Sequence, residues 1–140
     1  MTRHEIRETA FILLFEASFR EESPAELYAL AEEIGEWEVN AEVRALVEGV
    51  LAESDALDGI IASYSKKRAL SRIARVNLIV LRIAIYEISK RPDVPVNVAV
   101  SEAVALSGKY AGSEDISFIN GVLGAYVRSL PPRDGAAQEA

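Results

Sequence analysis

Apolar side chains recur every three or four residues along most of the chain, and short polar or proline-containing breaks separate the segments. This spacing is typical of amphipathic α-helices, and no stretch alternates as a convincing strand does. The predicted helices cover residues 3–20, 24–34, 41–64, 75–90, 96–110 and 114–130, with a short helical turn around 70–73. The pattern therefore predicts an all-α bundle of about six or seven helices.

The predicted boundaries fall on residue types that begin and end helices. Ser23, followed by a proline and then by Glu26, matches a capping box with proline in the first turn. Further caps are expected at Asn40 and Ser113, a left-handed stop at Gly35 and a helix end at Gly112. We expect residues 1–130 to form a single domain and residues 131–140 to form a flexible tail. The segment 75–90 is apolar on most sides, which places it at the centre of the bundle.

Length and composition narrow the protein class. The chain has 140 residues, 50% of them hydrophobic and 26% charged, which is an ordinary globular balance. It has no cysteine, so disulfides and thiolate metal sites are excluded. Its apolar runs are too short to span a bilayer, and its first residues lack the apolar core of a signal peptide. We therefore expect a cytoplasmic protein without membrane contact.

The net charge of −7 is distributed unevenly along the chain. Residues 1–20 are balanced, residues 21–58 carry −11, residues 59–91 carry +7 and the remainder carries −3. Such polarity can present a positive face to an anionic partner despite an acidic total. It is equally consistent with acidic and basic segments that neutralise each other in the folded protein, and charge alone leaves both interpretations open.

The residues offer little for catalysis. The single histidine, His4, lies near the chain start, which disfavours a catalytic triad or a histidine metal cluster. The eight glycines match neither a P-loop nor a dinucleotide fingerprint. We expect no enzyme activity, no cofactor and no metal.

The first helix has a second apolar stripe, made of Phe11, Phe15 and Phe19. A helix with two apolar faces is either buried on both or keeps one for a partner. These rings could pack against the 41–64 helix, or Phe15 could be partly exposed at an interface. Aromatic rings near arginines suit single-stranded RNA, because unpaired bases stack on rings while guanidinium groups hold phosphates.

The start of the last helix, 113–121, is a second candidate surface. Acidic side chains in a first turn are explained by the helix dipole, and they also discourage non-specific phosphate binding. Gly121 costs about 1 kcal/mol inside a helix relative to alanine, which close helix packing would explain. Phe118 and Asn120 have no such structural explanation, and we regard both as candidate RNA contacts.

Two stretches of the chain resemble the NusB family of bacterial transcription antitermination proteins. Residues 81–127 are similar to the C-terminal half of the family, with LRIAIYE, DVPVNVAVSEAV and FINGVLG in the same order and spacing. Residues 7–19, RETAFILLFEASF, are similar to its first helix. The resemblance covers essentially the whole chain, and it implies a non-catalytic fold of seven helices in two small subbundles.

The resemblance also implies partners. Family members bind boxA, a short single-stranded RNA element in the leaders of ribosomal RNA operons, together with the ribosomal protein NusE. The pair helps RNA polymerase to ignore terminators. The arginine-rich start of the family's first helix contacts RNA and corresponds to Arg3, His4 and Arg7, although Glu5 dilutes the positive charge here. Fewer phosphate contacts lower the affinity and its salt dependence.

Four further positions take their implied roles from the family. Phe118 corresponds to an aromatic RNA contact, and Asp115 corresponds to an acid whose loss of charge strengthens RNA binding. Phe15 corresponds to a partner-facing aromatic on the first helix. Asn77 corresponds to a partner-facing acid at the start of the central helix, so it is expected to contact the partner, although the change from an acid removes a possible ion pair.

Two alternatives remain beside an antitermination factor. The same domain occurs as an accessory module of ribosomal RNA cytosine methyltransferases, but only a tail follows Leu130, which disfavours this alternative. A homodimer that occludes the RNA surface is the other alternative.

Overall fold

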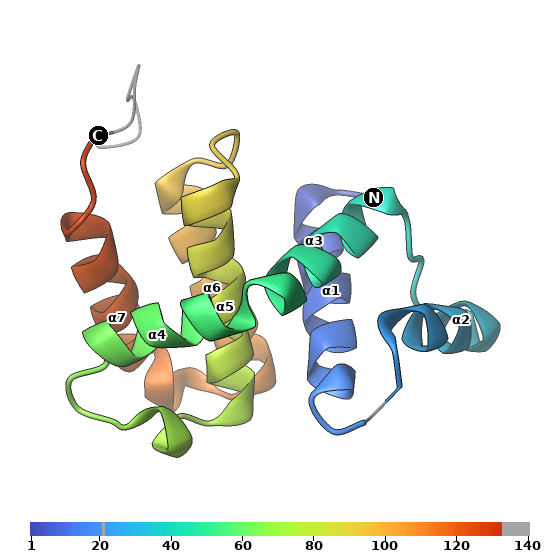
Figure 1. The fold of residues 1–140 in the computed structure, drawn as a ribbon, viewed down its shortest axis with the longest axis horizontal. Coiled ribbons are helices and arrows are strands. Elements are labelled where there is room, and N and C mark those ends of the chain that lie inside the picture. Colours follow the sequence, from blue (N-terminus) through green and yellow to red (C-terminus); the bar gives the residue numbers. More distant parts are fainter. Residues whose placement is uncertain (21, 133–140) are drawn as a thin grey trace. The chain divides into compact units, whose positions relative to one another are not determined.

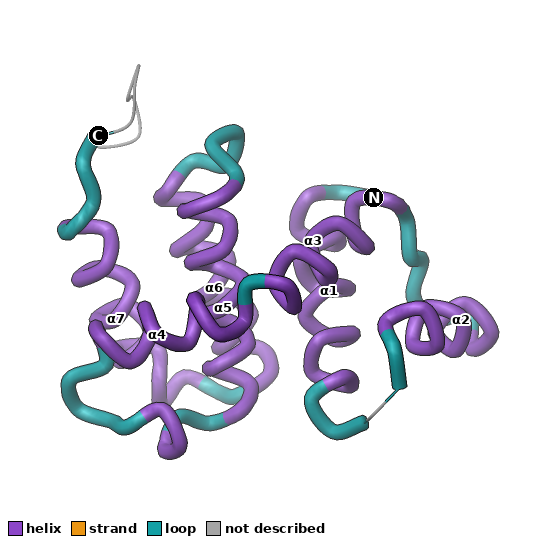
Figure 2. The backbone as a smooth tube through the Cα atoms, in the orientation of Figure 1, coloured by secondary structure: helices purple, strands orange, loops and turns teal. Residues whose placement is uncertain are grey.

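A computed structural model describes residues 1–20 and 22–132, and within these ranges it contains helices and no strands (Figures 1 and 2). It divides into two compact units, Met1–Glu53 and Ser54–Ala140, here called unit 1 and unit 2. The predicted all-α fold of seven helices in two subbundles is confirmed. Most of the predicted tail, 133–140, lies outside the described residues. None of the described helices is both long enough and apolar enough to cross a bilayer.

Unit 1 contains α1 (Arg3–Ala17), α2 (Pro24–Ile34) and α3 (Ala41–Ala52). Helix α1 packs against both α2 and α3. Apolar side chains on all three helices are buried, as their spacing predicted: Ile6, Ala10, Leu13 and Leu14 on α1, Leu27 and Ala31 on α2, and Val43, Leu46, Val47 and Val50 on α3.

The predicted helix ends in unit 1 are confirmed by their hydrogen bonds. Ser23 Oγ accepts from the Glu26 N–H at 3.3 Å, and Glu26 Oε1 accepts from the Ser23 N–H at 2.9 Å. Those bonds favour the charged carboxylate and hold the pKa of Glu26 below its ordinary value. Asn40 Oδ1 accepts from the Val43 N–H, and Gly35 ends α2 at φ +80°. Local sequence alone therefore sets the limits of α2.

Replacing Ser23 by alanine is expected to lower the free energy of unfolding by about 1 kcal/mol. The Ser23 hydroxyl accepts a hydrogen bond from the Glu26 N–H, and alanine would leave that N–H in the first turn of α2 without an acceptor in the protein. Urea denaturation followed by circular dichroism measures this change. Ser63→Ala is the matched control, since the Ser63 hydroxyl only donates back to the Gly59 carbonyl within its own helix. An equal loss for both variants would show that the cap adds nothing.

The predicted helix over 41–64 is wrong in one respect, because the structure has two helices there. Helix α3 ends at Ala52 and α4 (Ser54–Tyr64) follows, with Glu53 between them at φ −105° and ψ 10° (Figure 2). The Glu53 N–H donates to the carbonyls of Gly49 and Val50, a pattern shared between α and 3₁₀ bonding. The break assigns the two helices to different units, and neither glycine nor proline marks it in the sequence.

Unit 2 contains α4, α5 (Arg75–Lys90), α6 (Val96–Tyr110) and α7 (Ile116–Arg128), with short 3₁₀ turns at Leu70–Arg72 and Ser113–Asp115. Helix α5 packs against α4, α6 and α7, so its predicted central place is confirmed. Its buried apolar side chains are Ile79, Val80, Leu81, Ile83, Ala84, Ile85 and Ile88.

The start of α7 differs from the prediction. Ser113 begins a 3₁₀ turn instead of capping the helix, and Asp115 precedes the first helical residue without a side-chain capping bond. Gly112 does follow α6 at φ +99°, as predicted for a stop. The turn directs the carboxylate of Asp115 toward Arg68 and Asn77 of unit 2, and it forms a hydrogen bond with each of them.

Candidate nucleic-acid interface

Unit 2 has a groove of about 400 Å³ along one side of α7. The end of α4 and the loop that follows it form the opposite wall. The groove carries three cationic side chains, one carboxylate and two aromatic rings, and its lining residues are Tyr64, Lys66, Lys67, Arg68, Glu114, Ser117, Phe118, Gly121, Val122 and Ala125.

Arg68 is the central cation of this groove. Its Nη2 lies 3.0 Å from Asp115 Oδ1, and its guanidinium carbon lies 4.2 Å from the centre of the Phe118 ring. Both the ion pair and the cation–π contact are partly shielded from water, which strengthens each of them. Arg68 is therefore held over the aromatic ring while its guanidinium group bonds to the carboxylate beside it.

The carboxylate of Asp115 is fixed in turn from inside unit 2. Asn77 Nδ2 donates to Asp115 Oδ2 at 2.9 Å, and Ser107 Oγ donates to Asn77 Oδ1 at 2.7 Å. Asn77 and Ser107 are both 0% exposed. The prediction that Asn77 contacts a partner is therefore corrected, because its amide is buried and occupied. Asn77 instead orients Asp115.

The three residues at the start of α1 that were predicted to contact RNA differ in their exposure. Arg3 and His4 are exposed at the start of α1, and Arg3 Nη1 lies 3.5 Å from Glu42 Oε2. Glu5 accepts from the Thr2 N–H at 2.7 Å and so caps the helix. Arg7, in contrast, is only 5% exposed. A buried guanidinium offers no face to a phosphate, so the contact predicted for Arg7 is corrected.

Asn120 and Phe118 do not share a groove. Phe118 and Asn120 are two positions apart on α7, so their side chains point in directions about 200° apart around the helix. Asn120 accordingly lines a second groove of unit 2, between α6 and α7. Its lining includes four valines and one cation, Arg128. Asn120 is exposed, but it lies apart from the cationic groove.

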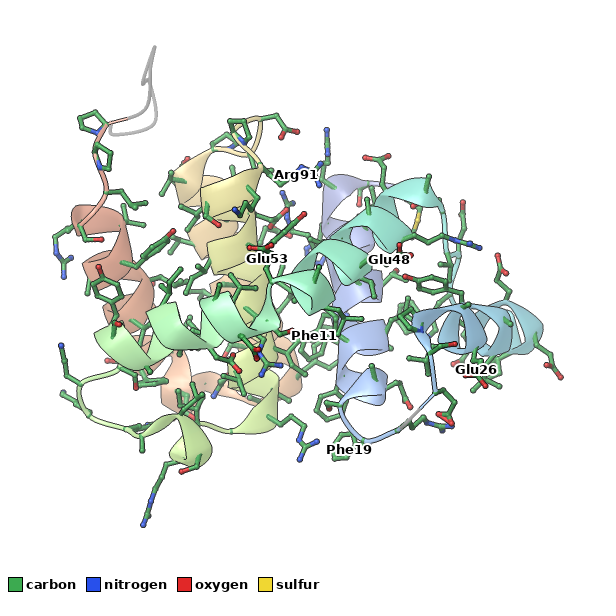
Figure 3. The ribbon with its side chains drawn as sticks, viewed as in Figure 1. Phe11, Phe19, Glu26, Glu48, Glu53 and Arg91 are labelled. Carbon is green, nitrogen blue, oxygen red and sulfur yellow. The ribbon has the colours of Figure 1, made fainter. Side chains whose placement is uncertain are left out.

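The aromatic stripe on α1 passes from the core to the surface. Phe11 is buried, Phe15 is half-buried and Phe19 is 62% exposed. Phe11 and Phe19 are labelled beside α1 in Figure 3. The centres of the Phe11 and Phe15 rings are 5.9 Å apart, and those of Phe15 and Phe19 are 4.9 Å apart with the rings edge to face. Phe11 therefore packs inside, whereas Phe15 and Phe19 keep accessible surface, and the partner contact of Phe15 stays a prediction.

A model of the NusB family matches residues 4–128. The chain belongs to the NusB family. A NusB-family relative from Acetivibrio thermocellus, a transcription antitermination protein, is 38% identical over 96% of this chain and 95% of its own length. The expected family resemblance is thus confirmed.

Solved structures of the NusB family have the same fold. NusB of T. maritima superposes with a TM-score of 0.80, at 29% identity, over 96% of each chain. A crystal structure of antitermination factors NusB and NusE in complex with dsRNA matches with a TM-score of 0.75, at 26% identity, over 91% of this chain and 97% of that one.

The basic wall of the groove lies in the net-positive stretch 59–91 of this NusB-family chain, which was expected to attract phosphate. The sequence did not tell which cations of that stretch are accessible, and the structure places Lys66, Lys67 and Arg68 in the groove. Arg82 is not accessible for RNA, because it forms two bonds of 2.7 and 2.8 Å with Asp58. The available signal was position: the three consecutive cations follow directly after a helix, in a loop, where side chains are exposed.

Proposed function

We propose that the protein is a transcription antitermination factor that binds single-stranded, boxA-like RNA from the leaders of ribosomal RNA operons together with NusE. It acts in the cytoplasm as part of an RNA polymerase antitermination complex, by binding alone and without catalysis. The family assignment supports this function, as do the names of the relatives and the NusB–NusE complex with dsRNA.

The observation that carries the proposal is the cationic groove beside Phe118. Lys66 and Lys67 are exposed at its edge and can each hold a phosphate. The half-buried Phe118 ring offers a surface on which a base can stack. Stacking requires an unpaired base, since bases inside an A-form duplex are already stacked and paired. This chemistry favours a single strand, or an unpaired segment of a longer RNA, over a continuous duplex.

Asp115 restrains this site. Its carboxylate pairs with Arg68 and so keeps the guanidinium group over the Phe118 ring. It also adds negative charge close to where the RNA phosphates would bind. RNA binding must therefore replace one charge-assisted bond by another, which lowers the net gain. Removal of the carboxylate charge releases Arg68 for a phosphate and opens the ring to a base.

Replacing Asp115 by asparagine is expected to tighten RNA binding about tenfold, which corresponds to 1.4 kcal/mol. The measurement is a fluorescence-anisotropy titration with a boxA-like oligonucleotide at fixed salt. Glu114→Gln is the matched control. Glu114 lines the same groove and its substitution removes the same charge, but no bond joins Glu114 to Arg68. An equal gain in RNA affinity for the two variants would show that only the loss of negative charge matters. An unchanged RNA affinity for Asp115→Asn would refute the proposal that Asp115 restrains Arg68.

The function itself is tested by binding a boxA-like RNA and a scrambled RNA, each single-stranded and as a duplex, with and without NusE. We expect preference for the single-stranded boxA-like sequence and tighter binding when NusE is present. Equal affinity for the scrambled strand in the presence of NusE would contradict specific antitermination binding. Preference for the duplex would contradict the stacking role of Phe118.

A further inference from the structure

Unit 1 has a groove of its own, between α1 and α2, with a volume of about 140 Å³. Its apolar lining includes Leu30, which is 37% exposed, and Ile34, which is 60% exposed. Trp37, the single tryptophan of the chain, is half-buried at one end. These side chains form one apolar surface, and apolar surface gathered in this way commonly marks a site that a partner covers.

The segment that forms one wall of this groove is rich in carboxylates, and one of them, Glu36, lines the groove itself. Glu32, Glu33, Glu36 and Glu38 follow one another along the end of α2 and the next loop, and all four are exposed. The sequence from 21 to 43 contains no lysine or arginine. The one cation in the groove, Arg20, is neutralised by Glu16 at 3.2 Å and by Glu22 at 3.6 Å. We call this surface the acidic-rimmed groove.

The position of these carboxylates opposes helix stability. The C-terminal end of a helix carries partial negative charge and favours cations, but α2 has Glu32 and Glu33 in its last turn and no basic residue there. Within the described residues none of the four rim carboxylates pairs with a cation. Neither the helix dipole nor an ion pair within the described residues accounts for the charge, whereas an external cation would compensate it.

We propose that the acidic-rimmed groove is a docking surface for a basic amphipathic segment of a protein partner. Apolar side chains of that segment cover Leu30 and Ile34 beside Trp37, and flanking lysines or arginines pair with Glu36 and the exposed carboxylates next to it in the sequence. The same carboxylates repel phosphates, so this surface excludes RNA. The inference is independent of the RNA groove on unit 2.

The test uses the full chain and a synthetic amphipathic peptide of leucine and lysine at helical spacing. Because Trp37 is the single tryptophan and lines the groove, its fluorescence reports binding there directly. We expect a saturable emission change whose midpoint rises with salt. A peptide in which glutamate replaces every lysine is expected to cause no change. An equal response to both peptides would overturn the proposed charge complementarity.

Variants decide whether the groove is the site. Ile34→Ser, and separately the triple variant Glu32→Gln, Glu33→Gln and Glu36→Gln, are each expected to weaken peptide binding about tenfold. Leu51→Ser is the matched control, since Leu51 is also an exposed apolar residue of unit 1 (39% exposed) but does not line the groove. The proposal fails if the groove variants bind like the unaltered chain, or if Leu51→Ser weakens binding as much as they do. Circular dichroism verifies that each variant remains folded.

Discussion

Replacing Phe118 by alanine is expected to weaken binding of a boxA-like single strand by about 1–3 kcal/mol, the usual contribution of one stacked base. This corresponds to a loss between about fivefold and 150-fold. The ring lines the cationic groove and supports Arg68 at 4.2 Å, so its removal eliminates a stacking surface and loosens a neighbouring cation. Electrophoretic mobility shifts at one salt concentration measure the change.

Two further variants separate stacking from simple burial at position 118. Phe118→Tyr keeps an aromatic face and is expected to retain most of the affinity. Phe118→Leu keeps an apolar side chain of moderate size but has no π face, and it is expected to behave like the alanine variant. If the leucine variant binds RNA as well as the unaltered protein, the ring serves packing and not base recognition.

The helix ends that depend on local chemistry could be predicted from the sequence. The capping bonds at Ser23 and Asn40 and the positive φ of Gly35 and Gly112 all involve residues within a few positions of each other. The central place of α5 was also predictable, because only a helix contacted on several sides can bury so many apolar residues. These features require no knowledge of distant contacts.

The site residues were harder to predict because their roles depend on distant partners. Asn77 meets Asp115, 38 positions away, and Arg68 meets Asp115, 47 positions away. Arg7 follows the charged start of α1 in sequence, but its side chain is buried. Charge and spacing identify which residues can bind phosphate, whereas tertiary contacts decide which of them are accessible. The burial of Asn77 and the pairing of Arg68 therefore became visible only in the folded chain.

Replacing Phe15 by aspartate is expected to abolish association with NusE, with a loss of about 2–4 kcal/mol if the ring is an aromatic anchor of that interface. Phe15 stands between a buried ring and an exposed one, so part of its surface is available to a partner. A carboxylate at this position would have to be desolvated among aromatic side chains when the partner binds. Co-elution with NusE in size-exclusion chromatography tests the expectation.

Leu51→Asp is the matched control for Phe15→Asp, because Leu51 is likewise an accessible apolar residue of unit 1 and the same charge is introduced. Phe15 also contacts Phe11, so the thermal midpoint of each variant must be measured beside the association. A folded Phe15→Asp variant that still co-elutes with NusE would remove Phe15 from the partner surface. Loss of co-elution in both variants would instead indicate a general sensitivity of unit 1 to added negative charge. Only a loss confined to Phe15→Asp, in a chain that remains folded, assigns the outer part of the aromatic stripe to the partner.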